Sequence, residues 1–77
     1  MNIFVGSLSF NVKDDQLKAA FENFGEVSSA RVLTDKFTGR SKGFGFVDMP
    51  DNAAAQKAID ALNGTELEGR AMVVNEA

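Results

Sequence analysis

One stretch of eight residues, Lys42 to Met49, limits what the chain can fold into more than any other. In it phenylalanines alternate with glycines, and a β-branched valine follows. Successive side chains of a strand point to opposite faces, so Phe44 and Phe46 share one face while Gly45 and Val47 share the other. Because a half-buried strand ordinarily turns its large apolar residues to the core, either the phenylalanine face is the core, or two phenylalanines are displayed to solvent for a reason.

A second β-type run, Ile3 to Gly6, shows the same arrangement. By alternation Ile3 and Val5 face the core, and Phe4 points to the other side. The following residues, 7–13, are expected to form a loop. In this loop the side chains of Leu8, Phe10 and Val12 are expected to be buried in the core.

Two amphipathic stretches predict helices. For the first, the candidate N-caps are Asn11 and Asp14, and Gly25 ends it. The second follows Pro50, with Asp51 as its cap. The apolar stripes that face the core are Leu17, Ala20, Phe21 and Phe24 in the first helix, and Ala54, Ala55, Ala58, Ile59 and Leu62 in the second.

The remaining segments complete a β-α-β-β-α-β order. Residues 27–35 read as a strand that a polar loop, 36–41, joins to the octapeptide, and residues 71–75 form the last strand. Residues 1–77 are therefore predicted to be a single α+β domain with a ferredoxin-like split βαβ fold, a four-stranded antiparallel sheet with both helices on one face. In that topology the first and third strands are central neighbours, so Phe4, Phe44 and Phe46 gather on the open face. Three exposed phenylalanines call for a ligand or a partner.

Composition excludes several classes of function. The chain has no cysteine and no histidine, which removes thiolate chemistry and the commonest general base and metal ligand. We therefore expect no enzyme, no metal site and no cofactor. An acylphosphatase-like activity on this topology is disfavoured because no arginine lies in residues 7–13. No apolar run approaches the ~20 residues of a membrane span, so a cytoplasmic protein is expected, or a nuclear one in a eukaryotic cell.

Charge is distributed unevenly along the chain. The formal net charge is −3, but the segment from Arg31 to Lys42 holds Arg31, Lys36, Arg40 and Lys42 against Asp35 alone. This local basic edge on an acidic body makes Arg31, Arg40 and Lys42 candidates for phosphate contacts. Few such contacts predict modest affinity.

The two aromatic strands resemble the RNA recognition motif family. The octapeptide is similar to that family's octamer, K/R-G-F/Y-G/A-F-V-x-F/Y, departing from it only at Met49. Residues 3–8 resemble its hexamer. The match is close to small bacterial proteins with a single such motif and to the motif of glycine-rich RNA-binding proteins. The resemblance implies that Phe4 and Phe44 stack on successive bases, Phe46 packs against sugars, Lys42 contacts phosphate, and Asn75 reads base edges.

Two further residues have open interpretations. Asp48 either accepts a hydrogen bond from a base amino group or simply lies at the sheet edge. Phe37, an aromatic in a polar loop, either folds back on the sheet edge or provides an extra stacking group.

The expected function is non-catalytic, sequence-tolerant binding of single-stranded RNA by a monomer, in a post-transcriptional or RNA-chaperone role. Single-stranded DNA is an alternative ligand. The competing hypothesis is a protein-interaction module that uses the sheet or an acidic helical face, and it includes burial of the three phenylalanines under a tail, a second domain or a dimer partner.

Overall fold

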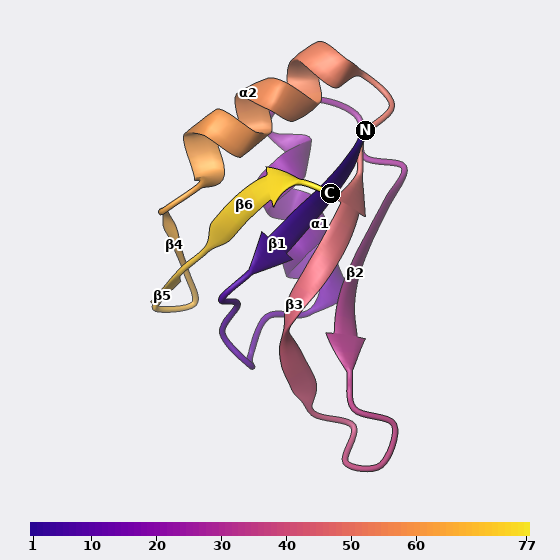
Figure 1. The fold of residues 1–77 in the computed structure, drawn as a ribbon, viewed down its shortest axis with the longest axis vertical. Coiled ribbons are helices and arrows are strands. Elements are labelled where there is room, and N and C mark those ends of the chain that lie inside the picture. Colours follow the sequence, from indigo (N-terminus) through magenta and orange to yellow (C-terminus); the bar gives the residue numbers. More distant parts are fainter.

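The computed structural model describes residues 1–77 as a four-stranded antiparallel sheet with two helices packed behind it (Figure 1). The strand order is β2-β3-β1-β6, so the first and third strands are central. This confirms the predicted ferredoxin-like fold and the neighbouring positions of the two aromatic strands. The elements are β1 (Asn2–Gly6), α1 (Asp14–Glu22), β2 (Ser29–Thr34), β3 (Ser41–Asp48), α2 (Asn52–Leu62), β4 (Glu66–Leu67), β5 (Arg70–Ala71) and β6 (Val73–Glu76).

The core lies between the sheet and the helices and contains no polar side chain. Ile3 and Val47 are among its members, as period-two alternation predicts. Apolar residues of the two helices cover them from the other side. Phe21 is the largest fully buried side chain. The cluster comprises Ile3, Val5, Leu8, Val12, Leu17, Phe21, Val27, Val32, Val47, Met49, Ala54, Ala55, Ala58, Ile59, Met72 and Val74.

The loop between β1 and α1 departs from the prediction at one position. Leu8 and Val12 are buried, but Phe10 is 63% exposed, so its assignment to the core is wrong. Phe10 lies in a tight turn in which Val12 N–H donates to the Ser9 carbonyl oxygen at 3.1 Å. This turn directs Leu8 and Val12 inward and leaves Phe10 outside.

The start of α1 also differs from the prediction. Neither Asn11 nor Asp14 is the N-cap; Lys13 occupies that position, and its N–H donates to Gln16 Oε1 at 2.9 Å. Asp14 is the first helical residue, and its Oδ1 accepts a hydrogen bond from Val32 N–H at 2.8 Å. Because β2 is an edge strand, this bond occupies a donor that would otherwise face solvent and attaches α1 to the sheet.

The N-terminal end of α2 behaves as predicted. Asp51 caps the helix, and its Oδ1 accepts from Ala53 N–H at 2.9 Å and from Ala54 N–H at 3.2 Å. At the other end Asn63 is the C-cap, and its Oδ1 accepts from Val74 N–H at 3.0 Å. Gly64 follows with φ of 84°, the left-handed region that favours glycine. The helix is thus attached to β6 at its C-terminal end.

The bond from Val32 to Asp14 can be tested with a matched pair of variants. Asp14→Ala should lower the free energy of unfolding by about 1.5 kcal/mol more than Asp15→Ala, because only Asp14 accepts the edge-strand N–H. Both carboxylates lie in the first turn of α1, so the loss of the helix-dipole interaction is common to both. Urea denaturation measures the difference, and equal losses would contradict the role of Asp14 at the strand edge.

Candidate nucleic-acid interface

Phe4, Phe44 and Phe46 form a cluster, the aromatic triad, on the sheet face opposite the helices. Ring centroids are 5.9 Å apart for Phe4–Phe44, 5.8 Å for Phe4–Phe46 and 6.3 Å for Phe44–Phe46. These distances fall in the range of favourable aromatic pairs. Phe46 is 40% exposed, and the other two rings are partly exposed. The structure therefore brings together the three aromatics that the sequence predicted on one face.

Strand register explains why the rings meet. β1 and β3 are antiparallel, with Phe4 directly opposite Phe46, and Phe44 lies two residues along the same face of β3. The Phe4 and Phe44 rings are inclined by only 33°, whereas Phe46 meets them at 66° and 87°. Phe46 thus packs edge-on against a pair of rings that are closer to coplanar.

Glycine between the two β3 aromatics permits a close approach of β2. A Cβ on Gly45 would lie 2.3 Å from the Arg31 carbonyl oxygen, a backbone atom that cannot yield as a side-chain end can. A side chain between Phe44 and Phe46 would therefore require β2 to shift away from β3.

Predicted polar site residues border the triad. Asn75 lies opposite Phe4 on β6, and Arg31 lies opposite Phe46 on β2. These two pairings place one polar or charged residue on each outer strand beside a triad ring. The triad is therefore bordered on both sides by groups that can hydrogen-bond a ligand.

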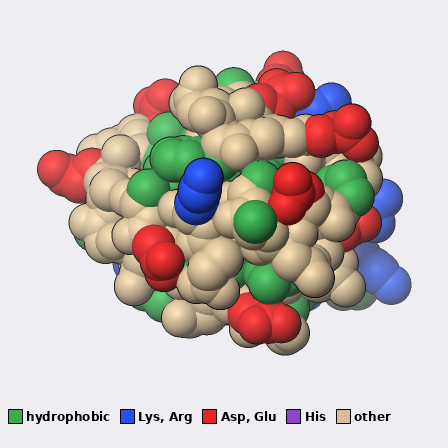
Figure 2. Space-filling view, turned by 90° about the horizontal axis from the view of Figure 1, so that it is seen from above, with side chains coloured by type: hydrophobic (Ala, Val, Ile, Leu, Met, Phe, Trp, Pro, Cys, Tyr) green, Lys and Arg blue, Asp and Glu red, His purple; other side chains and the backbone are tan.

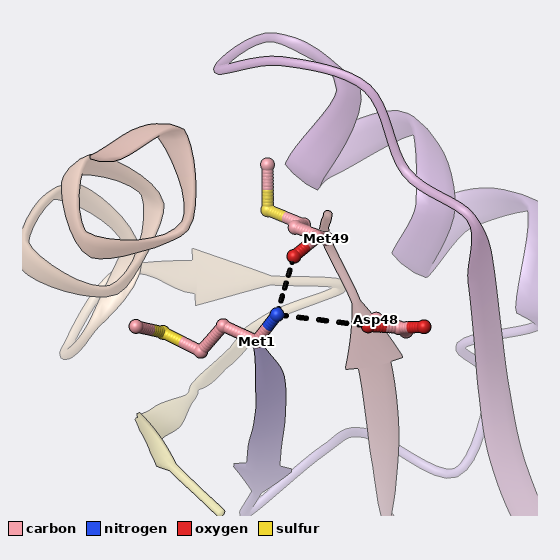
Figure 3. A network of polar contacts seen from close by, with 3 residues as sticks. All are labelled: Met1, Asp48 and Met49. Carbon is pink, nitrogen blue, oxygen red and sulfur yellow. Dashed lines mark hydrogen bonds and ion pairs between the residues drawn. The ribbon is translucent and has the colours of Figure 1, made fainter. Parts of the chain in front are cut away.

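Asp48 lies at the end of β3, where its Oδ1 is 3.8 Å from the Met1 amine (Figure 3). That amine also donates to the Met49 carbonyl oxygen at 2.6 Å. Asn2 and Ser29, which the sequence did not single out, flank Asp48 on the neighbouring strands. Only the register between strands places them there, and no sequence motif marks it.

The β2–β3 hairpin loop is shaped by Asp35. Its Oδ1 accepts from Phe37 N–H at 2.7 Å and from Thr38 N–H at 3.2 Å. These two backbone donors, helped by the positive charge of Lys42, lower the pKa of the Asp35 carboxyl below its usual value of 3.8. The loop conformation leaves Phe37 97% exposed, so the interpretation that it folds back on the sheet edge is wrong.

The hairpin cations form no ion pair, although Lys42 lies near enough to Asp35 to help lower its pKa. Arg40 and Lys42 are exposed, and the one ion pair of the structure joins Met1 and Asp48. Seen from above, the end of the molecule opposite the hairpin carries many scattered acidic side chains (Figure 2). The hairpin cations are therefore available to an anionic ligand, at the far end from much of the acidic charge.

The Asp35 turn predicts a specific pH dependence. Since folding lowers the pKa of Asp35, its contribution to loop order is present above pH 3.8 and is lost as the pH falls through the lower folded-state pKa. An NMR titration should show the Phe37 and Thr38 amide resonances shifting with a midpoint below 3.8. Asp35→Ala should abolish this titration. A midpoint at or above the usual value would contradict the two amide bonds.

A four-stranded sheet backed by two helices, with aromatic residues exposed on its two central strands, defines a class of modules that bind ligands on the sheet surface. The chain belongs to the RNA recognition motif family, whose model matches residues 3–73. This is a family of binding modules and not of enzymes. No helix of the structure is long and apolar enough to cross a membrane.

Two curated relatives illustrate the range of the similarity. The putative RNA-binding protein RbpE of the cyanobacterium Nostoc is 47% identical over 77 residues, which cover 100% of this chain and 78% of that protein. A glycine-rich RNA-binding protein of Daucus carota is 45% identical over 74 residues, 96% of this chain and 47% of that protein. The chain spans less than half the length of the plant glycine-rich relatives it matches.

Solved structures agree with the fold. The crystal structure of RNA-binding protein PG1 is 48% identical, with a TM-score of 0.96 over 100% of this chain and 93% of that one. An SXL-lethal protein/RNA complex is 37% identical, with a TM-score of 0.92 over 99% of this chain and 47% of that one. Both likenesses extend over nearly all of the chain, so the sheet and both helices have counterparts in proteins described as binding RNA.

Proposed function

We propose that residues 1–77 act as one domain that binds single-stranded RNA through the aromatic triad. The observation that carries the proposal is the placing of three phenylalanines 5.8 to 6.3 Å apart on the sheet face that no helix covers. Each base stacked on an aromatic ring contributes about 1 to 3 kcal/mol to binding. A single hydrophobic cluster of 16 buried residues supports treatment of the chain as one unit. The printed descriptions of the relatives, RNA-binding proteins and a protein–RNA complex, support the choice of ligand.

Ring orientation suggests how the strand lies on the sheet. The small angle between Phe4 and Phe44 suits two successive bases, each stacked on one ring. Phe46, packed edge-on against both, suits contact with the sugars between those bases. In this arrangement Asn75 beside Phe4 and Asp48 at the end of β3 would hydrogen-bond base edges.

The basic hairpin would hold the phosphates. Arg31, Arg40 and Lys42 are exposed cations that form no ion pair, and the exposed ring of Phe37 offers a further stacking surface at the hairpin tip. Stacking reads no specific base, so binding is sequence-tolerant. A chain of net charge −3 gains little from nonspecific attraction. Affinity therefore depends mainly on the triad.

The same surface accepts single-stranded DNA, since every base has a π-face and only contacts to the 2′-hydroxyl distinguish RNA. Duplexes bind poorly because their bases are already stacked. We propose a monomeric protein that acts in the cytoplasm on RNA after transcription, as a binding or chaperone module that needs no cofactor.

Replacement of a triad ring tests the proposal. Phe44→Ala should weaken binding of a short oligouridine by roughly 5- to 100-fold, the loss of one stacked base. Phe44→Tyr keeps the ring and should bind nearly as well as the unchanged protein. Since Phe44 lies outside the core cluster, both variants should give the circular dichroism spectrum of the folded domain. Unchanged affinity in Phe44→Ala would refute the triad as the binding surface.

Phosphate contact by the hairpin has its own signature. Lys42→Gln should reduce the slope of log Kd against log salt concentration by about 0.7, the value for one phosphate contact to a single strand. Lys57→Gln serves as the control, because Lys57 is an exposed cation on α2, behind the sheet. If both variants keep the original slope, Lys42 makes no phosphate contact.

A further inference from the structure

Phe10 lies outside the triad, in the β1–α1 loop beside the start of β3. The β1–α1 loop runs along the start of β3, where Leu8 N–H donates to the Gly43 carbonyl oxygen at 2.8 Å. The Cε1 atom of Phe10 lies 3.4 Å from the position a Cβ on Gly43 would take. The 63% exposed ring of Phe10 therefore packs against β3 at Gly43, the residue that precedes Phe44 in the chain.

A hollow of about 560 Å³ adjoins this ring, between the β1–α1 loop and the hairpin. Its only charged side chains are Lys13 and Arg40, both exposed and neither in an ion pair. The neighbouring hollow contains Asp14 and Asp15, but Asp14 already accepts the Val32 N–H bond. The six residues that line the hollow are Phe10, Asn11, Lys13, Gly39, Arg40 and Ser41.

These features together select one class of ligand. A single exposed apolar side chain on a protein surface needs no explanation. Here, however, the ring stands beside a concavity with two free cations and no carboxylate, in a chain whose acidic residues outnumber its basic ones by 11 to 8. A planar base with an attached phosphate would interact with both the ring and the cations: the base stacks on Phe10, and the phosphate lies between Lys13 and Arg40. The Asn11 amide remains for polar atoms of the base, and the Ser41 hydroxyl, whose oxygen accepts from Gly43 N–H at 3.1 Å, can still donate to one.

We propose that this hollow is a further nucleotide subsite, filled by the same single strand after it leaves the triad. The inference rests on the proposed function, because the triad must bind the strand first. It assigns a binding role to two residues outside the aromatic strands and the hairpin, Phe10 and Lys13. The protein then binds a longer segment of RNA than the two or three bases that a sheet platform stacks.

A fluorescent side chain in place of Phe10 reports on the subsite directly. The chain has no tryptophan and no tyrosine, so Phe10→Trp introduces a single fluorophore in an exposed position. Its emission should be quenched by an oligouridine of about eight nucleotides, which extends beyond the triad, and not by a dinucleotide or trinucleotide that fills only the triad. Anisotropy of labelled RNA should show that the triad is saturated in each case.

Affinity measurements give a second test. Phe10→Leu keeps an apolar contact with Gly43 but removes the ring, and it should weaken binding of the eight-nucleotide RNA by about fivefold to a hundredfold, with the trinucleotide unaffected. Lys13→Gln should also weaken only the longer RNA. Lys57→Gln on α2 should change neither.

The outcomes separate this inference from the proposed function. If the emission of the Phe10→Trp variant stays constant while the longer RNA saturates the protein, or if Phe10→Leu binds both lengths normally, the subsite is refuted and the triad stands. If Phe44→Ala leaves trinucleotide binding unchanged, the proposed function itself fails. Weakening of the longer RNA alone by both Phe10→Leu and Lys13→Gln supports the subsite.

Discussion

Burial of one face of the sheet is the constraint on which the rest of the structure depends. Both helices pack on the same side, and the 16 residues of the core all lie there and are all apolar. Strand residues alternate between faces, so each core position on β1 and β3 leaves its neighbour on the open side. Phe4, Phe44 and Phe46 occupy those positions, where they pack against one another and remain at least partly exposed. A second layer of helices would bury them and leave no surface for a ligand.

Two loops determine which side chains lie around the aromatic triad. The Asp35 carboxylate organises the hairpin tip and leaves Phe37 in solvent, while the bond from Leu8 to Gly43 holds the β1–α1 loop against β3. Both loops converge on the same end of the sheet, where exposed cations and aromatics accompany each other. Electrostatic attraction is thus concentrated at this end of an acidic molecule, and a bound strand would be oriented as well as held by it.

Sequence reasoning predicted the features that periodicity determines. Alternation sorted the residues of the two aromatic strands into two faces, and the predicted topology identified the open one. The helical stripes gave most of the helical core residues, and Asp51 was recognised as a cap from its place after Pro50. Positions that depend on loop conformation or on contacts distant in sequence were not predictable. The sequence assigns Phe10 to the core with Leu8 and Val12, but the turn from Ser9 to Val12 leaves it exposed. Asp14 was considered as a cap, but its carboxylate is bound to an edge strand 18 residues away.

Substitutions at Gly45 and at the two residues beside it would have different effects on this domain. The residue on either side of it contributes a ring to the open face and nothing to the core, so substitutions there alter recognition while the fold persists. At Gly45 itself the Arg31 carbonyl oxygen leaves no room for a side chain, and any replacement must separate β2 from β3. A change at an aromatic position would therefore alter ligand contacts without moving the strands, whereas a side chain at the glycine between them would change the spacing of the strands themselves.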